Sequence, residues 1–332
     1  MSRTIHVLSV QNLNEDQLQR LRSISPQLHI EQRSGSPEEM LTPETEVLYG
    51  SSGRFNLQKA SSLRWVQVDS AGVNHLHNTP LWHSDITITS ANGIHAIQIA
   101  EHVLMGLLAL GHHLPQMQRL QQAHQWGHHN FQPPFELRGA TLGIVGYGAI
   151  GREVARLASA FGMRILATKQ PGRPTTFDGW TSANTGDPTG SLPERYYSLE
   201  ELSVMLAESD AVVLAVPLTE RTRHVIGSDE LAVMPPHALL VNIGRGALID
   251  QEALIKALQE GRIGGAALDV TDPEPLPPES PLWSIDNVII TPHVSGGSAH
   301  YNDRVVELFT ENLRRYLHDE PLLNIVQREL GY

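Results

Sequence analysis

The sequence predicts an α/β protein built from two doubly wound domains, each with a parallel sheet between layers of helices. Apolar runs of strand length alternate with helical patterns over residues 1–98 and again over residues 140–292. Such alternation is typical of parallel strands joined by crossover helices. A length of 332 residues also suggests two domains rather than one, and either could bury a core.

The pattern of residues 1–98 predicts a small parallel sheet. We expect a helix at residues 15–24 and strands at residues 5–10, 28–31, 46–49, 65–68 and 86–89. The small residues at 69–73 follow the fourth strand, where this type of sheet places its ligands, so their N–H groups are free to face a small anion. A plain turn would fit the same residues. The very apolar helix at 97–110 is expected to be buried between domains or against another copy of the chain.

A glycine-rich turn opens the second region. The apolar strand at 142–145 runs directly into Gly146, Gly148 and Gly151, and helical spacing starts at Ile150. In a dinucleotide-binding turn the first glycine makes the tight turn, the second lets the backbone approach a pyrophosphate, and the third lets the helix pack on the strand. The helix N-terminus would hold the phosphates. A glycine turn closing an ordinary βα unit is the alternative.

The next strand, at 164–168, ends at the position that selects the cofactor. An NAD-specific fold expects an acid about 20 residues past the glycines, to accept hydrogen bonds from the ribose. Thr168, Lys169 and Gln170 stand there instead, and Arg173 follows. Because cations attract a 2′-phosphate, we predict NADP, with NAD possible if Lys169 is only a solvated loop charge.

The remaining pattern completes a Rossmann sheet of six or seven strands. Helices are expected at 199–207 and 250–259, and strands at 211–216, 238–243, 265–270 and 288–290. Residues 171–195, rich in Pro, Gly, Thr and Ser, are too long for a simple connection and predict a surface excursion near the adenosine end, without chemistry. The final helix, at 302–317, is long enough to cross back to the first domain.

Composition excludes several classes of function. A net charge of −12 argues against nucleic-acid binding, which needs a basic face. No run approaches the roughly 18 apolar residues of a membrane span, and the first residues lack a secretory signal. With no cysteine there is no disulfide or thiolate site, which fits a cytoplasmic protein. The neighbouring histidines at 112–113 and 128–129 point to different faces, and we predict no metal site.

Three polar residues lie at or just past predicted strand ends. Arg245 follows VNIG, Glu274 lies in LDVTDPEPLP, and His293 lies in ITPHVSGG. A guanidinium can bind a substrate carboxylate through two hydrogen bonds. An imidazole can protonate a carbonyl oxygen while hydride reaches its carbon, and a bonded carboxylate favours the charged imidazole. Taken singly, each residue could be a surface arginine, a loop glutamate or a turn histidine.

Six segments together resemble the D-isomer-specific 2-hydroxyacid dehydrogenase family. Four of them, GIVGYGAIG, VNIGRGALID, AALDVTDPEPLP and TPHVSGGS, stand in the family's order and at its spacing, and the match extends to DSAGVNHL and ANGIHAIQIAEH. The resemblance implies a flavodoxin-like substrate domain formed by residues 1–98 and 296–332, and an NAD(P)-binding Rossmann domain over residues 99–295. It also implies a cleft between the domains as the active site, a homodimer built around the cofactor domains, and a small 2-oxo or 2-hydroxy acid as substrate.

The same resemblance assigns roles to individual residues. Arg245 would bind substrate, with Glu274 and His293 as the acid–base pair, and Ala71, Gly72 and Asn92 would also contact substrate. The implied cofactor-binding residues are Gly146, Gly148, Ala149, Ile150, Gly151, Thr168, Lys169, Arg173, Val216, Pro217, Thr222, Ile243, Gly244, Arg245, Asp269, His293 and Gly296. Lys169 replaces the usual acid, as in members that resemble NADPH-dependent glyoxylate and hydroxypyruvate reductases, and His112 stands where many members carry an arginine.

Two other functions are weighed against a 2-oxo acid reductase. A dinucleotide-sensing binding protein, resembling the C-terminal-binding-protein corepressors, would keep the same three polar residues. The absence of a long polar tail after the last helix argues against it. Formate dehydrogenase is disfavoured because its histidine is partnered by glutamine, whereas this sequence has Glu274.

Overall fold

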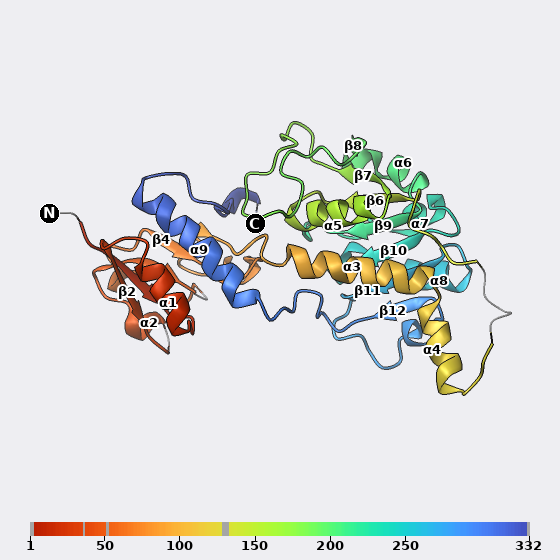
Figure 1. The fold of residues 1–332 in the computed structure, drawn as a ribbon, viewed down its shortest axis with the longest axis horizontal. Coiled ribbons are helices and arrows are strands. Elements are labelled where there is room, and N and C mark those ends of the chain that lie inside the picture. The colour runs from red at the N-terminus through yellow and green to blue at the C-terminus, as the bar shows by residue number, and fades with distance from the viewer. Residues whose placement is uncertain (1–2, 36, 51–52, 128–132, 331–332) are drawn as a thin grey trace. The chain divides into compact units, whose positions relative to one another are not determined.

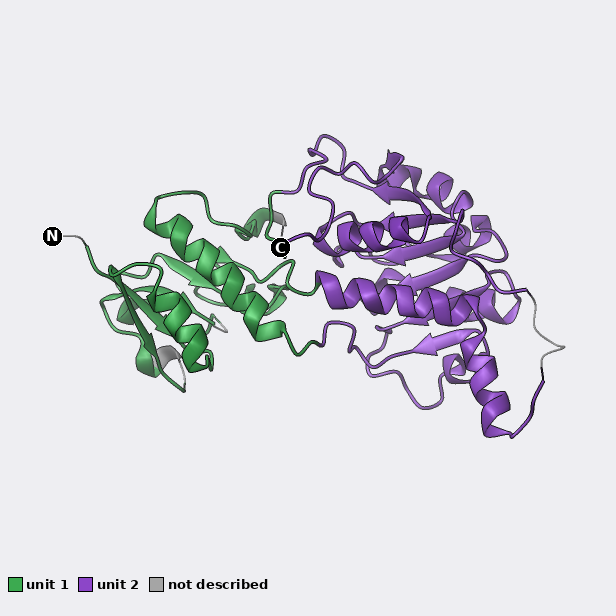
Figure 2. Cartoon of the chain, viewed as in Figure 1, with its two compact units in different colours: residues 1–95, 178–182, 298–332 green, residues 96–177, 183–297 purple. Residues whose placement is uncertain are grey.

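The chain forms two compact units. The computed structural model describes residues 3–35, 37–50, 53–127 and 133–330. Unit 1 comprises residues 1–95, 178–182 and 298–332, and unit 2 comprises residues 96–177 and 183–297 (Figure 2). Each unit has its own parallel sheet, as the strand–helix alternation predicts, so the α/β fold class is confirmed.

Unit 1 contains a five-stranded sheet in the order β2-β1-β3-β4-β5, with every pair parallel (Figure 1). The strands are β1 (Ile5–Ser9), β2 (Leu28–Gln32), β3 (Thr45–Tyr49), β4 (Trp65–Gln67) and β5 (Thr87–Thr89). The helices are α1 (Glu15–Arg22), α2 (Pro37–Met40) and α9 (Tyr301–Leu317). Asn14 caps α1 through the N–H of Gln17, which fixes the start of that helix.

The return helix α9 completes the core of unit 1. Leu18 and Leu21 of α1 share one buried cluster with Val305 and Phe309 of α9 and with Trp65 of the sheet. The opposite face of the sheet is covered by loops and short 3₁₀ turns around Phe55 and Leu76. A segment some 200 residues further along the chain therefore buries one face of the N-terminal sheet, as the predicted crossing back of the last helix requires.

Unit 2 contains a seven-stranded parallel sheet in the order β12-β11-β10-β9-β6-β7-β8. The strands are β6 (Thr141–Val145), β7 (Arg164–Thr168), β8 (Arg195–Tyr197), β9 (Ala211–Leu214), β10 (Leu239–Asn242), β11 (Gly265–Leu268) and β12 (Val288–Ile290). The helices are α3 (Ala96–Gly111), α4 (Leu114–Gln122), α5 (Ala149–Ala160), α6 (Leu202–Ala207), α7 (Ser228–Val233) and α8 (Gln251–Gln259). The order reverses between β6 and β9, which is where such sheets bind ligands, beyond the carboxyl ends of the strands.

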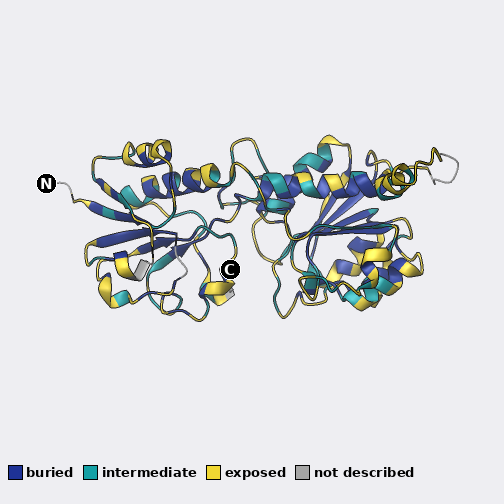
Figure 3. Cartoon of the chain, turned by 90° about the horizontal axis from the view of Figure 1, so that it is seen from below, coloured by how far each residue is buried: buried dark blue, intermediate teal, exposed yellow. Residues whose placement is uncertain are grey.

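Helices cover both faces of this second sheet. In β9, Val213 packs with α3 and α5, whereas Val212 and Leu214 pack on the opposite face with α6, α7 and α8. The alternation follows from the two-residue period of a strand. Figure 3 shows the result: most strand residues of both sheets are buried, and the outer faces of the helices are exposed. No helix among the described residues is both long enough and apolar enough to cross a membrane.

The segment 171–195 departs from its prediction. Its last residue begins β8, an edge strand that the sequence pattern does not indicate, and Trp180 is 7% exposed in the core of unit 1. The prediction of a plain surface excursion is therefore wrong for Trp180. A single indole within a polar, proline-rich stretch has no periodicity, so the pattern could not show that it is buried. Of the histidines weighed as metal ligands, His128 and His129 lie outside the described residues.

The packing of α9 on the first sheet generates a stability prediction. Phe309 is fully buried, and its ring stacks on Tyr49 with 4.4 Å between centroids. Phe309→Ala should lower the free energy of unfolding by about 3 to 5 kcal/mol, because it removes a buried ring and leaves a cavity. Denaturant unfolding measures the loss. Trp126→Ala is the control, since Trp126 is 95% exposed and its removal should cost less than about 0.5 kcal/mol.

Candidate active site

The glycine turn after β6 has the geometry of a phosphate-binding loop. Gly146 has φ +103°, and a Cβ there would lie 2.6 Å from the carbonyl oxygen of Ala215. At Gly151 a Cβ would lie 2.3 Å from the oxygen of Gly146 and 3.0 Å from Ile144 on β6. Around Gly148, in contrast, nothing lies within 4 Å of the Cβ position. The first glycine thus makes the turn, the third lets α5 approach β6, and the middle one leaves a space beside the backbone.

That space lies at the start of α5. Gly148 is the N-cap residue of this 12-residue helix and has no side chain to cap it. The N–H groups of Ala149 and Ile150 in the first turn point toward the N-terminus, where a helix favours negative charge. Thr168, at the end of β7, accepts a hydrogen bond from Gly146 N over 2.9 Å and so fixes the turn. The residues fit the pyrophosphate of a dinucleotide.

Lys169 lies directly after β7, at the position where the cofactor-selecting residue is expected. Its backbone N–H donates to the oxygen of Tyr197 on β8, over 2.8 Å. Its ammonium lies 5.5 Å from the centre of the Tyr196 ring. Arg173 is exposed a short way along the same loop. The edge strand β8, which the sequence pattern does not indicate, therefore contacts both the backbone and the side chain of Lys169.

The ends of β9 and β10 form two further loops. Thr222 is buried, and its hydroxyl donates to the oxygen of Pro217 over 2.7 Å, which closes the loop that follows Val216. At Gly244, after the buried Ile243, a Cβ would lie 3.1 Å from the oxygen of Val216. The two loops therefore pack against each other, and a side chain at Gly244 would force them apart.

Arg245 is exposed at the tip of the β10 loop, and a buried asparagine holds its backbone. Asn242 donates from Nδ2 to the oxygen of Arg245 over 2.9 Å and accepts at Oδ1 from Gly244 N over 3.1 Å. The Arg245 guanidinium donates to the oxygen of Gly244 over 2.7 Å. Sequence reasoning missed Asn242, although its place at the end of an apolar strand is the signal that could have found it.

Gly246 brings the loop of Arg245 against the loop that leads to Glu274. A Cβ at Gly246 would lie 1.9 Å from the oxygen of Thr271 and 2.6 Å from the nitrogen of Asp272. Only glycine permits so close an approach of two backbones. The structure therefore brings together the β10 loop and the segment immediately before Glu274.

His293 and Glu274 form a hydrogen-bonded pair. The ring nitrogen Nδ1 of His293 lies 2.7 Å from Oε1 of Glu274, and both side chains are about half exposed. A carboxylate oxygen can only accept, so Nδ1 is the donor and Nε2 is left to hold or release a proton. His293 has φ +54°, a left-handed conformation that is uncommon for a residue other than glycine.

Asp269 holds the loop that presents His293. Its carboxylate accepts from the hydroxyl of Thr291 over 2.6 Å and from the N–H groups of Val294 and Ser295, each over 3.0 Å. Its own backbone oxygen accepts from His293 N over 2.9 Å. Burial alone would raise the pKa of the Asp269 carboxyl, but the hydrogen bonds from Ser295, Thr291 and Val294 outweigh it and lower that pKa.

Helix α3 supports the same loop from a distant part of the sequence. His102 lies 3.1 Å from the hydroxyl of Thr291. Gln98 donates from Nε2 to the oxygen of Gly296 over 3.0 Å. The two side chains are one helical turn apart, so a single face of α3 contacts both ends of the loop.

The three predicted substrate contacts of the N-terminal region lie in unit 1. Ala71 and Gly72 follow β4, and within the described stretches of the chain their N–H groups donate to no other residue. Asp69, two residues before Ala71, is held by Gln11, whose amide donates to its carboxylate over 2.7 Å. Asn92 is exposed, and its backbone oxygen accepts from Asn324. Arg245, Glu274 and His293 all belong to unit 2.

Comparison with known proteins gives consistent matches. Residues 104–295 match the family described as D-isomer specific 2-hydroxyacid dehydrogenase, NAD binding domain. A glyoxylate reductase of Korarchaeum cryptofilum is 36% identical over 276 residues, which span 82% of this chain and 79% of that protein. An (S)-sulfolactate dehydrogenase of Chromohalobacter salexigens is 35% identical over 263 residues, 79% of this chain and 80% of that protein.

A solved structure agrees over the whole length. The crystal structure of a D-isomer specific 2-hydroxyacid dehydrogenase from Xanthobacter autotrophicus Py2, in complex with NADPH and MES, covers 100% of both chains. It aligns with a TM-score of 0.76 and 26% sequence identity.

The open space at Gly148 generates a prediction about cofactor binding. Gly148→Ala should weaken NADPH binding roughly tenfold or more, the effect of about 1.4 kcal/mol, because the new methyl group occupies the approach to the helix N-terminus. The backbone at Gly148 has φ −86°, which alanine adopts freely, so the free energy of unfolding should change little. Titration calorimetry measures the dissociation constant.

Gly151→Ala serves as the contrast for that experiment. Its Cβ would collide with the oxygen of Gly146, so this variant should lose both stability and cofactor binding. Wild-type NADPH affinity in Gly148→Ala would show that no phosphate approaches the turn.

Proposed function

Because this chain belongs to the D-isomer-specific 2-hydroxyacid dehydrogenase family, we propose that it reduces small 2-oxo acids to 2-hydroxy acids with NADPH as its preferred cofactor. The chain is an oxidoreductase that uses a nicotinamide dinucleotide, and oxidation of 2-hydroxy acids is the reverse of the same reaction. The observation that carries the proposal is the 2.7 Å hydrogen bond between His293 Nδ1 and Glu274 Oε1.

The acid–base step belongs to His293. When bound, the reduced nicotinamide supplies a hydride to the carbonyl carbon of the substrate. Nε2 of His293 gives its proton to the carbonyl oxygen, which becomes the hydroxyl of the product. Glu274 holds the ring through Nδ1 and stabilises the imidazolium form that carries the proton. Asp269 keeps His293 in its left-handed conformation through the neighbouring N–H groups.

Recognition of the substrate carboxylate falls to Arg245 and to two backbone N–H groups. The guanidinium of Arg245 is exposed, and its planar donors suit a carboxylate. The N–H groups of Ala71 and Gly72 donate to no other described residue, which leaves them available for an anion. Asn92 is assigned to the same substrate. Residues 1–98 with 296–332 are proposed as the substrate domain, and residues 99–295 as the cofactor domain.

Replacement of His293 tests this mechanism. His293→Asn should lower kcat by roughly 10² to 10⁴, because the proton donor is lost, while asparagine tolerates the left-handed backbone at this position. NADPH affinity should stay near the wild-type value. Steady-state rates and calorimetry measure the two quantities. Glu274→Gln, which keeps the shape and removes the charge, should lose less activity. Full activity in His293→Asn would mean that another group supplies the proton.

NADPH preference is proposed from Lys169 and Arg173. Lys169 stands at the tip of β7 where an acid would select NAD, and Tyr196 supports its side chain. The related structure from Xanthobacter autotrophicus contains NADPH, which supports the proposal. If Lys169 serves only as a solvated loop charge, both cofactors will bind.

A charge reversal at Lys169 tests the cofactor preference. Lys169→Asp should raise the KM for NADPH roughly tenfold, because a hydrogen bond to a charged phosphate contributes about 1.5 to 3 kcal/mol. It should lower the KM for NADH, since an acid can accept from the ribose hydroxyls. Lys256→Asp on α8 is the control, with the same change of charge at another place. An unchanged ratio of the two KM values would remove Lys169 from the cofactor site.

Glyoxylate and hydroxypyruvate are the substrates we propose. The glyoxylate reductase of Korarchaeum cryptofilum supports the first, and the lysine at position 169 supports both by analogy with NADPH-dependent reductases. The similarity to an (S)-sulfolactate dehydrogenase makes larger, anionic 2-oxo acids the natural competitors. Turnover of any of these 2-oxo acids would also exclude the alternative, a non-catalytic dinucleotide sensor, which the relatives do not favour.

We also propose a homodimer built on the cofactor domains. Consecutive helices α3 and α4 expose Met105, Leu114 and Met117, each more than two-fifths exposed. Large apolar side chains left exposed on helices are a feature of subunit interfaces. The proposed cytoplasmic location rests on the lack of cysteine in the sequence.

A further inference from the structure

The segment 171–195 links the two units a second time. The main connections lie at residues 95–96 and 297–298. The chain leaves unit 2 again after Phe177, contributes residues 178–182 to unit 1, and returns at residue 183. We call residues 175–192 the strap. The two ends of the strap belong to unit 2, and its apex, residues 178–182, belongs to unit 1.

A buried arginine anchors both ends of the strap in unit 2. Arg152 of α5 is 4% exposed, and its guanidinium donates to the oxygen of Thr175 over 2.6 Å and to the oxygen of Asp187. The same guanidinium lies 4.8 Å from the Tyr147 ring centre and 5.2 Å from that of Phe177. A buried guanidinium that binds two backbone oxygens is a fixed attachment. Breaking these hydrogen bonds would leave a buried charge and buried carbonyl oxygens without partners, which costs free energy.

The glycine turn itself forms the second anchor. Tyr147, between the first two glycines, donates its hydroxyl to Asp187 Oδ2 over 2.7 Å. Burial would raise the pKa of Asp187, but hydrogen bonds from Leu192, Tyr147 and Ser191 lower it below its usual value. Glu153 accepts from Gly186 N over 2.6 Å. The strap therefore starts and ends on the residues that surround the proposed pyrophosphate site.

The apex of the strap packs into the core of unit 1. Trp180 is 7% exposed and belongs to the buried cluster under α1 and α9. A Cβ at Gly93, where φ is +93°, would lie 2.2 Å from the backbone oxygen of Trp180. Glycine is therefore required beside Asn92 because the strap passes there.

Asn324 joins this apex to the loop of Asn92. Its Oδ1 accepts from Trp180 N over 3.0 Å, and its Nδ2 donates to the oxygens of Asn92 over 2.8 Å and of Ser90 over 3.2 Å. One amide side chain thus bridges the strap and the loop. Its backbone oxygen also accepts from Ser90 N over 3.0 Å.

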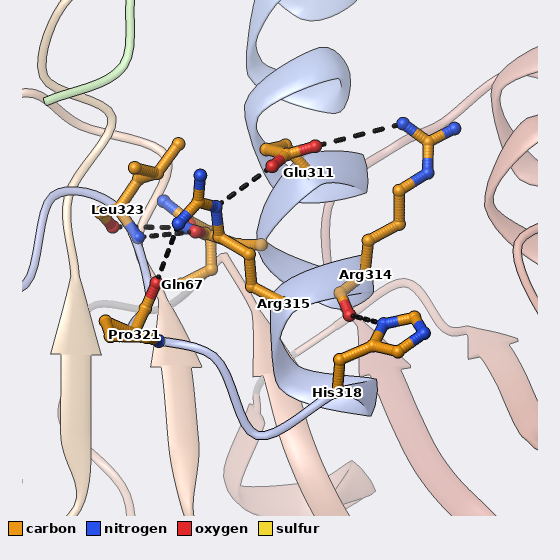
Figure 4. A network of polar contacts seen from close by, with 8 residues as sticks. Gln67, Glu311, Arg314, Arg315, His318, Pro321 and Leu323 are labelled. Atoms are coloured by element: carbon orange, nitrogen blue, oxygen red, sulfur yellow. Dashed lines mark hydrogen bonds and ion pairs between the residues drawn. The ribbon is translucent and has the colours of Figure 1, made fainter.

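A polar network fixes the residues just before Asn324. Figure 4 shows Arg315 of α9 bonded to Glu311 and to the oxygen of Pro321, over 2.9 Å and 3.1 Å. Leu323 donates its N–H to Asn312 Oδ1 over 2.7 Å. These contacts hold the chain up to residue 323 and so restrict the amide of Asn324, which bonds once to the strap at Trp180 and twice to the loop at Ser90 and Asn92.

We infer that Trp180 and Asn324 are positioning residues for the Asn92 loop, and that the strap couples this loop to the glycine turn that binds the dinucleotide. Neither residue touches the reacting atoms. The inference rests on the proposed function, in which Asn92 contacts the 2-oxo acid. Simple filling of the core by Trp180 would predict an effect on stability alone.

Asn324→Asp tests the inference with little change of shape. The variant keeps the oxygen that accepts from Trp180 and loses the two donor bonds to the loop. We expect the KM for glyoxylate to rise roughly three- to tenfold, the value of one or two hydrogen bonds, with kcat and the NADPH dissociation constant within about twofold of wild type. Asn287→Asp, which loses one similar bond in unit 2, is the matched control.

Two variants at the apex separate positioning from packing. Trp180→Phe keeps an aromatic ring in the core and should retain a wild-type KM, whereas Trp180→Ala should raise it. If the alanine variant does not fold, Asn324→Asp still decides. A folded Asn324→Asp enzyme with a wild-type KM overturns the inference, and so does an equal change in the NADPH dissociation constant.

A readout without turnover keeps the two proposals distinguishable. Hydrogen exchange followed by mass spectrometry reports the amides of residues 90–93. NADPH should slow this exchange in the wild-type protein, and Asn324→Asp should abolish the slowing. Exchange that does not respond to NADPH overturns the coupling. An inactive wild-type protein whose exchange does respond would instead overturn the proposed function and leave the strap in place.

Discussion

The candidate active site depends on one buried carboxylate. Asp269 receives three donors from the loop after β12, and these hydrogen bonds fix the course of the loop around the carboxylate. The left-handed conformation of His293 lies within that loop and is held by the bonds on either side. Without those bonds, the backbone conformation of His293 would be unfavourable. The hydrogen bonds to the buried Asp269 carboxylate therefore position His293 for its pairing with Glu274.

Most of the fold could be predicted from the sequence because its strands are strongly apolar and regularly spaced. The predicted ends of β9, β10 and β11 lie one or two residues beyond the observed strands. Apolar residues, Val216, Ile243 and Val270, stand just past each strand, and the pattern counts them as part of it. The edge strand β8 was missed, since its sequence RYY is short and polar. Periodicity reports burial on one side of a strand, and an edge strand with few neighbours gives little of that signal.

The site was predictable where chemistry and position coincide. Arg245, Glu274 and His293 are reactive residue types at strand ends, and the structure joins two of them by a hydrogen bond. The supporting residues were not found. Asn242, Tyr147 and Arg152 act through backbone atoms or through a segment far along the chain, and a local pattern contains no record of such partners. The roles of all predicted site residues stay predictions.

The return of α9 to the first sheet affects how the protein is made. During synthesis the first 95 residues leave the ribosome about 200 residues before Val305 and Phe309, which cover one face of their sheet. Trp65 and Tyr49 must then remain uncovered while the whole of unit 2 is produced. Until α9 has been made, such a nascent chain exposes an apolar surface of the kind that favours aggregation. In this protein the N-terminal unit is synthesised first and can be completed only last.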